Sequence, residues 1–332
     1  MDRPVTAHIL DYTDRCRIDD LQEFVSEPTT LSISRPLAGP VDLTGQIFGT
    51  IGDYVAGGTF GNVYRCEWRQ PYGPTVKVAV KALRFHTSEQ DLRRFRREST
   101  IWAHLVHDNI VRLVGTTEGF GLTTALVSPW FPDGDLLHMI AAQGAGLSIR
   151  SKLKLLHGIA SGLDYLHRFP VVHGDITSSN VLIDVKDGEY KACLMDFGLS
   201  TVLGGLLDES TNEGSKIRHG AIRWTAPELL TPHDHPADLK PTTKHDMYSF
   251  GRVMFHVLTL VIPWHDINDF NIIQKIFSGE DVSRPETSDI TDARWDQIEQ
   301  CWSVDPSARP SASMALDFLK SELEALKQDV SA

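Results

Sequence analysis

The chain has 332 residues, of which 41% are hydrophobic and 23% charged, and its formal net charge is −12. This composition is ordinary for a globular protein, and the acidic balance argues against a nucleic-acid partner, which would need a basic face. No charged segment followed by an apolar run begins the chain, and the longest apolar stretch, 253–262, is shorter than the roughly 20 residues that span a bilayer. We therefore expect no membrane segment and a cytoplasmic protein.

The four cysteines are far apart in the sequence and form no C-x-x-C pair. A disulfide framework or a structural zinc site would need clustered spacing. We therefore expect free thiols in a reducing compartment at Cys16, Cys66, Cys193 and Cys301.

The first part of the chain differs in composition from the rest. Residues 1–30 are acidic and mixed, and residues 34–40 are rich in turn formers. We expect residues 1–48 to form a flexible N-terminal extension.

From Ile51 onward the sequence predicts a small β-rich half with one helix. Short runs of clustered or alternating apolar residues indicate strands, and Ser88 is placed to cap the helix. The predicted strands are 54–55, 62–68, 76–82, 110–115 and 124–127.

After Gly134 the pattern becomes mainly helical. Ser148 can cap a long amphipathic helix, and residues 201–223 form a long irregular segment of the kind that is often functional. We therefore expect an α+β fold with two lobes in one domain, 49–325. Its parts are an N-lobe, 49–130, a helical C-lobe, 131–325, and a short tail, 326–332.

Residues 55–63 place several glycines between two predicted strands. The backbone N–H groups of such a turn can approach phosphate oxygens closely. Alone this signal is weak, because a glycine-rich hairpin is more often only a turn. The candidate phosphate-binding residues are Ala56, Gly57, Gly58 and Gly61.

Lys81 ends the strand-like run V-A-V-K, where its side chain should be half buried, and a buried ammonium needs an anionic partner. Glu98 shares a face of the next predicted helix with apolar residues, and a carboxylate there also needs a partner. Either residue alone could be a surface charge, but together they predict an ion pair.

Three further polar residues stand in two loop-like runs. Asp175 and Asn180 lie five residues apart, so one can accept a proton while the other offers a carbonyl oxygen to a hard cation. Asp196 follows a short apolar strand, where a carboxylate suits Mg²⁺. Taken singly, each run is more often an ordinary polar loop. Glu228 and the distant Arg309 are a candidate buried ion pair.

Taken together and in this order, the motifs resemble the protein-kinase signature set: a glycine-rich loop, V-A-V-K, a helical glutamate, H-x-D-x-x-x-x-N, D-F-G and A-P-E. The match covers most of the chain, from about Ile51 to about Leu323. The runs R-W-T-A-P-E and K-H-D-M-Y-S-F-G look most like the tyrosine-kinase and tyrosine-kinase-like branch.

The resemblance implies a role for each site residue. Lys81 would hold the α- and β-phosphates of ATP and be held by Glu98. Asp175 would position the substrate hydroxyl and take its proton, and Asn180 and Asp196 would hold Mg²⁺. The implied adenine-binding residues are Val63, Ala79, Ser128, Pro129, Phe131 and Leu182.

Within this set, Ser128 occupies the position behind the adenine, where its small side chain should leave an open pocket. The purine amino group would donate to the Pro129 carbonyl, and the Phe131 N–H would donate to the ring. Proline lacks only an N–H, so Pro129 does not spoil this arrangement.

Four positions depart from the family pattern. Ala56 stands where the family has the first glycine of the glycine-rich loop. Gly174 stands where the family has an arginine that pairs with a phosphate group on the activation loop. We therefore expect weaker dependence on phosphorylation of that loop. Thr177 stands where the family has a cationic side chain that contacts the γ-phosphate of ATP. Ala221 stands where the family has a residue that differs between serine/threonine kinases and tyrosine kinases.

The leading interpretation is an active protein kinase that uses ATP and Mg²⁺ on a serine, threonine or tyrosine hydroxyl of a protein. The alternative is a pseudokinase, a nucleotide-binding scaffold with weak or no transfer, suggested by Gly174, Thr177 and Ala221. A small-molecule kinase is a third reading, since one fold can host several substrate classes. The sequence leaves the substrate protein and the oligomeric state open.

Overall fold

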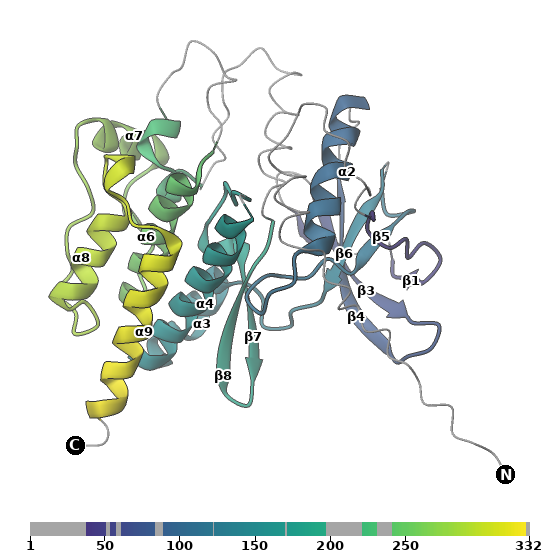
Figure 1. Ribbon diagram of the computed structural model, residues 1–332, viewed down its shortest axis with the longest axis horizontal. Coiled ribbons are helices and arrows are strands. Elements are labelled where there is room, and N and C mark those ends of the chain that lie inside the picture. The colour runs from purple at the N-terminus through teal and green to yellow at the C-terminus, as the bar shows by residue number, and fades with distance from the viewer. Residues whose placement is uncertain are drawn as a thin grey trace.

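The computed structural model describes residues 38–50, 54–57, 61–83, 89–121, 123–169, 171–196, 221–230 and 241–329. They form a β-rich lobe with one helix and a larger helical lobe, side by side (Figure 1). The predicted α+β, two-lobed fold is therefore confirmed. Most of the N-terminal extension, the residues Gly58, Phe197 and Cys16, and the segment 201–220 lie outside the described residues.

The N-lobe is built on an antiparallel sheet whose main path runs β1-β3-β4-β6-β5, with β2 paired to β3. Helix α2, Glu89–His104, packs beside the sheet in Figure 1. Buried and more exposed residues alternate along parts of β3 and β4, and the buried side chains of Tyr64, Val78 and Val80 belong to a small hydrophobic core. The strands are β1 (Ile47–Phe48), β2 (Tyr54–Gly57), β3 (Gly61–Arg69), β4 (Thr75–Leu83), β5 (Gly115–Thr117) and β6 (Ala125–Pro129).

Most of the predicted N-lobe strands are confirmed, but the predicted strand 110–115 is wrong. Ile110 makes only an isolated bridge to Leu194, and strand β5 starts at Gly115. The Val111 N–H donates to the Leu194 carbonyl of the C-lobe, whereas the Val114 N–H donates to Val127 in the N-lobe. The apolar run therefore crosses from one lobe to the other instead of pairing along one strand.

The boundary at residue 49 stays a prediction, although the packing extends a few residues further back. Leu43 is 2% exposed and lies in the N-lobe core. Strand β1 pairs with β3, and Asp42 bridges to Thr116. Residues 42–48 thus lie on the N-lobe sheet.

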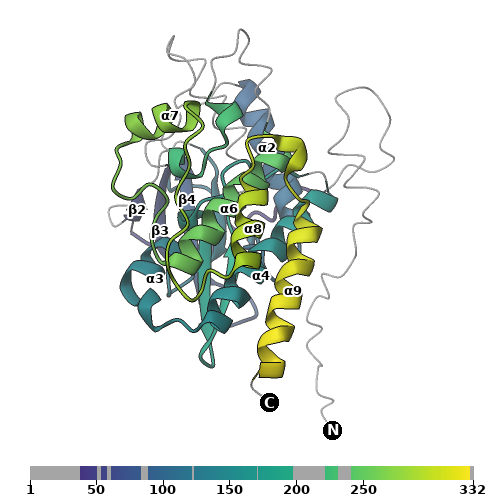
Figure 2. The same cartoon turned by 90° about the vertical axis from the view of Figure 1, so that its left-hand side faces the viewer.

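The C-lobe surrounds helix α6, Thr243–Thr259, which is buried along most of its length. Figure 2 shows α8, α9 and α4 from the side of this lobe, with the N-lobe behind them. The β-hairpin β7–β8 (Val181–Lys186, Glu189–Leu194) lies toward the N-lobe (Figure 1). The other α-helices among the described residues are α3 (Leu136–Gln143), α4 (Ile149–Arg168), α7 (Asp269–Phe277), α8 (Asp292–Cys301) and α9 (Ala312–Asp329).

Helix α4 begins as the sequence predicts. The Ser148 hydroxyl accepts a hydrogen bond of 3.1 Å from the Ser151 N–H, and so satisfies one of the unpaired amides of the first turn. The apolar face of α4 includes Leu153, Leu156 and Leu163, all fully buried in the main core. This helix fixes the position of the loop that follows it.

The cysteines among the described residues have free thiols, as the sequence predicts. Cys66, Cys193 and Cys301 are free and buried, and burial raises the pKa of the Cys66 and Cys193 thiols to about 11 and of Cys301 to about 12. No helix among the described residues is both long and apolar enough to cross a membrane.

Candidate active site

The loop 173–180, which joins α4 to β7, is fixed at its start by a buried carboxylate on α6. Asp246 is 1% exposed and accepts hydrogen bonds from the N–H groups of His173, at 2.9 Å, and Gly174, at 2.8 Å. His167 Nε2 lies 2.9 Å from the same carboxylate. Burial opposes ionisation of Asp246, but these hydrogen bonds outweigh it and lower its pKa below the usual range.

Within this loop, Asn180 reaches back to Asp175. Its amide nitrogen donates to the Asp175 carbonyl oxygen at 2.7 Å and to the carboxylate Oδ2 at 2.8 Å. Because the nitrogen takes both bonds, Oδ1 of Asn180 points elsewhere, and none of the described residues donates to it. The two polar residues that the sequence picks out are therefore in contact.

Lys81 and Asp196 come together from the two lobes. Lys81 stands on β4 and Asp196 just beyond β8, and Lys81 Nζ lies 2.5 Å from Asp196 Oδ2. Asp196 has a φ of 63°, in the left-handed region that non-glycine residues rarely adopt, as at many functional sites. Glu98 lies within α2, but its side chain is outside the described part, so its pairing with Lys81 stays a prediction.

This donor set fits a magnesium ion and a polyphosphate. The Asp196 carboxylate and Asn180 Oδ1 are hard oxygen ligands of the kind that Mg²⁺ prefers. Lys81 supplies a cation beside them for phosphate oxygens. Among the described residues, no cluster of three or more His, Cys, Asp and Glu side chains could hold a metal by itself. Mg²⁺ usually keeps several waters and shares its coordination with substrate phosphates, which this sparse set permits.

The strands on either side of the glycine-rich run pair with each other as the sequence predicts, and residues 58–60 between them lie outside the described part of the chain. Ala56 pairs with Val63 and Gly57 with Asn62 across β2 and β3. A Cβ atom on Gly61 would lie 2.2 Å from the Ala82 carbonyl oxygen, so a larger residue would force β3 and β4 apart. Glycine at this position is therefore required by packing as well as suited to phosphate.

The six residues expected around adenine come from adjoining elements at the junction of the lobes. In the N-lobe sheet, Ala79 on β4 is paired with Ser128 on β6, and Val78 with Pro129. Phe131 and Leu182 are partly buried and pack against the main core, and Val63 lies opposite Lys81 in the β3–β4 register. The register of the N-lobe sheet places Val63, Ala79, Ser128 and Pro129 on neighbouring strands. The contacts of all six residues with a base stay a prediction.

We expect Ser128 to make the protein unusually sensitive to inhibitors with a bulky group behind the adenine. The side chain is small and only partly buried, and it sits beside Ala79. Replacing Ser128 with phenylalanine should weaken such inhibitors by at least about tenfold, because a lost apolar pocket is typically worth roughly 1–3 kcal/mol. Inhibition curves for both proteins test this, and equal potency would contradict it.

Three departures from the family pattern line one cavity. It has a volume of about 40 Å³, enough for a small polar group, and borders Gly174, Asp175, Thr177 and Ala221. None of the described residues lining it is a lysine or an arginine. Thr177 is 5% exposed, and its hydroxyl lies 2.9 Å from that of Ser179. Gly174 has a φ of 73°, so a side chain there would be strained.

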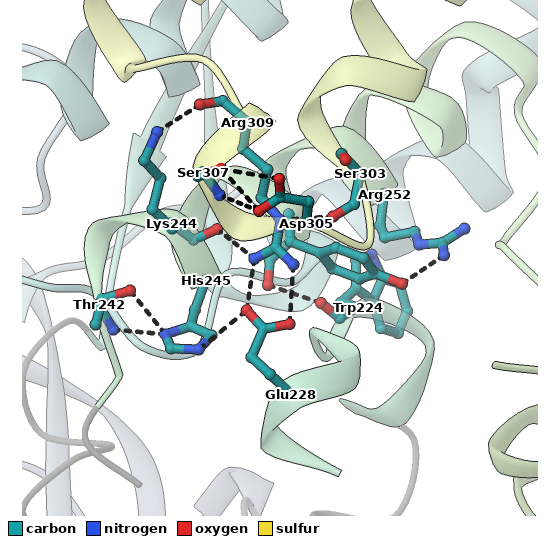
Figure 3. A network of polar contacts seen from close by, with 12 residues as sticks. Trp224, Glu228, Thr242, Lys244, His245, Arg252, Ser303, Asp305, Ser307 and Arg309 are labelled. Atoms are coloured by element: carbon teal, nitrogen blue, oxygen red, sulfur yellow. Dashed lines mark hydrogen bonds and ion pairs between the residues drawn. The ribbon is translucent and has the colours of Figure 1, made fainter. Parts of the chain in front are cut away.

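Glu228 and Arg309 form the predicted ion pair. The two guanidinium nitrogens lie 2.6 and 2.8 Å from the two carboxylate oxygens, and His245 Nε2 lies 3.1 Å from Glu228 (Figure 3). Arg309 is 1% exposed and also donates to the carbonyls of Ser303 and Lys244. Burial opposes ionisation of Glu228, but hydrogen bonds from His245 and Arg309 more than offset it and lower its pKa to about 2.

Sequence reasoning missed two histidines that contact the site. His167 supports Asp246, and His256 on α6 lies 2.8 Å from the Ser178 hydroxyl of the loop. The only available signal was that His256 interrupts the apolar run 253–262. Such an interruption predicts a polar partner but does not say which residue provides it.

A family model described as protein tyrosine and serine/threonine kinase matches residues 50–319. Among curated proteins, the chain is 33% identical over 276 residues to the serine/threonine-protein kinase CTR1 of Arabidopsis thaliana, covering 81% of this chain and 31% of that protein. It is 33% identical to the probable serine/threonine-protein kinase SIS8 of the same plant, covering 82% of this chain and 25% of that one. It is 28% identical to Ephrin type-B receptor 1 of Gallus gallus, covering 86% and 28%. The chain thus spans less than a third of the length of these relatives.

Proposed function

The chain belongs to the protein tyrosine and serine/threonine kinase family, in its tyrosine-kinase and tyrosine-kinase-like branch, and on this premise we propose that it transfers the γ-phosphate of ATP to serine or threonine hydroxyls of a protein substrate. The preference for serine and threonine rests on the two plant relatives, which are named serine/threonine-protein kinases. The comparisons give no support to the pseudokinase alternative. A cytoplasmic location stays a prediction.

One observation carries the proposal: four polar residues from three segments form two contacting pairs, and a hydrogen bond from the Met195 N–H to the Asn180 carbonyl joins the segments that carry them. Lys81 contacts Asp196, and Asn180 contacts Asp175. If the pair of Lys81 and Asp196 had only a structural role, it would not need a second carboxylate nearby, that of Asp175, held by the side-chain amide of Asn180. In phosphoryl transfer a protein mainly positions groups and neutralises charge, and these residue types do both.

Each residue then has a defined task. Lys81 binds phosphate oxygens and neutralises their charge. Asp196 and Asn180 Oδ1 would hold Mg²⁺, which would neutralise part of the charge of the phosphates. Asp175 orients the substrate hydroxyl and receives its proton, while the Asn180 amide keeps the carboxylate in one orientation.

Transfer of labelled phosphate from ATP to the protein itself and to a generic protein substrate tests the proposal. We expect Mg²⁺-dependent labelling that Asp196→Asn removes, with the label on phosphoserine and phosphothreonine after acid hydrolysis. Label on phosphotyrosine would overturn the assigned substrate class. Absence of transfer, with ATP still raising the melting temperature, would overturn the activity and favour the scaffold.

Thr177→Lys should raise the rate of transfer. The cavity beside Asp175 is lined by two carboxylates and, among the described residues, by no lysine or arginine, so the ammonium group of a lysine would be attracted there. One charge-assisted contact to a transition state typically raises the rate a hundredfold or more. We expect a smaller gain in kcat, roughly tenfold, because ordering the flexible lysine side chain costs part of this energy. Steady-state kinetics measure this, with Thr177→Met as a control of similar length without charge. An equal effect of both substitutions would contradict the prediction.

A further inference from the structure

Helix α6 holds the 173–180 loop at a second point, far from Asp246. The Ser178 hydroxyl lies 2.8 Å from Nδ1 of His256, in the last turn of the helix. Ser178 is fully buried and His256 is 2% exposed, so water does not compete for this hydrogen bond. A hydrogen bond between buried groups is stronger than one in water, and a buried polar atom without a partner destabilises the protein.

The histidine is suited to a fixed hydrogen bond because it is neutral. Burial lowers the pKa of His256 to about 4, well below physiological pH. A neutral imidazole has one ring nitrogen that donates and one that accepts, and a serine hydroxyl can do either. The contact is therefore satisfied whichever atom carries the proton, and no charge has to be buried.

The contact leads directly to the site. Ser178 begins the short 3₁₀ helix Ser178–Asn180, so fixing Ser178 fixes the start of the turn that carries Asn180. Asn180 in turn donates to the carbonyl and the carboxylate of Asp175. Asp246 fixes the other side of Asp175 through the N–H groups of His173 and Gly174. Asp175 thus lies between two attachments to one rigid, buried helix.

We propose that His256 is a positioning residue for phosphoryl transfer, which holds Ser178 so that Asn180 keeps both the Asp175 carboxylate and its own amide oxygen in place. This inference rests on the proposed function. Asp246 holds the start of the loop and the Met195 N–H holds the Asn180 carbonyl, while His256 holds the Ser178 hydroxyl between them. A small displacement of a catalytic group can lower the rate strongly.

Two substitutions of nearly equal size separate positioning from packing. His256→Asn keeps a polar atom at the position of Nδ1, whereas His256→Leu has none, and both remove the ring. We expect His256→Leu to lower kcat by roughly tenfold with the KM for ATP within about twofold, and His256→Asn to recover most of the loss. Ser178→Ala should lower kcat similarly and add little to His256→Leu. Equal kcat for the Asn and Leu variants, or fully additive effects of His256→Leu and Ser178→Ala, would overturn the inference.

A second readout does not depend on activity. Hydrogen exchange of the amides from Asp175 to Asn180 should be faster in His256→Leu than in His256→Asn at matched distance from each melting temperature. Exchange at Leu156 and Ile159 on α4 should be equal in the two variants. If wild type transfers no phosphate, the proposed function fails, and exchange alone decides the positioning role. Equal exchange of the loop in both variants overturns it.

Discussion

Asp175→Asn should lower the rate of phosphoryl transfer by roughly a hundredfold to ten-thousandfold, the range expected when a positioned general base is lost. The amide oxygen of the new side chain can still accept from Asn180 Nδ2, which now lies 2.8 Å from the carboxylate. The loop should therefore keep its shape, with only the proton acceptor lost. Single-turnover transfer of labelled phosphate measures the effect.

The effect should fall on chemistry and not on nucleotide binding. The groups expected to hold ATP, Lys81 and Asp196, pair with each other rather than with Asp175. The rise in melting temperature with ATP and Mg²⁺ should therefore match that of wild type. Asp187→Asn makes the same chemical change at an exposed turn residue with a φ of 52°, which asparagine tolerates, and should leave the rate unchanged. More than about a tenth of wild-type activity in Asp175→Asn would exclude Asp175 as the base.

The sequence predicted what depends on local pattern and on motif order. Strands β3, β4 and β6 and the Ser148 cap of α4 follow from alternation and capping chemistry within a few residues. The pairing of Glu228 with Arg309 could be predicted because a buried charge needs a partner and the family order supplied one. The sequence also places Asp175 and Asn180 in one loop, but it does not predict the hydrogen bonds between them.

Contacts between distant segments of similar character could not be predicted in this way. His256 and Ser178 are 78 residues apart, and many other buried polar atoms could have satisfied either one. Gly174, Thr177 and Ala221 come from two distant parts of the sequence, and the fold brings all three to one cavity. The run 110–115 was predicted as a strand because its apolar pattern is the same whether its amides pair within one lobe or between two.

Arg309→Ala should destabilise the protein by about 3–5 kcal/mol, the range for removing one partner of a buried ion pair. Its guanidinium is fully buried, makes two short bonds to Glu228, and lies 5.0 Å from the centre of the Tyr248 ring. Removal takes away both of these bonds to Glu228 and the hydrogen bonds that Arg309 donates to the carbonyls of Ser303 and Lys244. Urea unfolding followed by tryptophan fluorescence and circular dichroism gives the free energy of unfolding.

Two comparisons make this expectation specific. Lys320→Ala removes an exposed pair with Asp317 on α9 and should change the free energy of unfolding by less than about 1 kcal/mol. The pKa of Glu228 is lowered to about 2 in the folded protein from 4.5, so the stability it contributes is present above pH 4.5 and is lost as the pH falls toward 2. The free energy of unfolding of Arg309→Ala should therefore fall less than that of wild type as the pH is lowered from 4.5 to the acid transition. A variant whose free energy of unfolding stays within about 1 kcal/mol of wild type would show that the pair contributes no more than an exposed one, despite its burial.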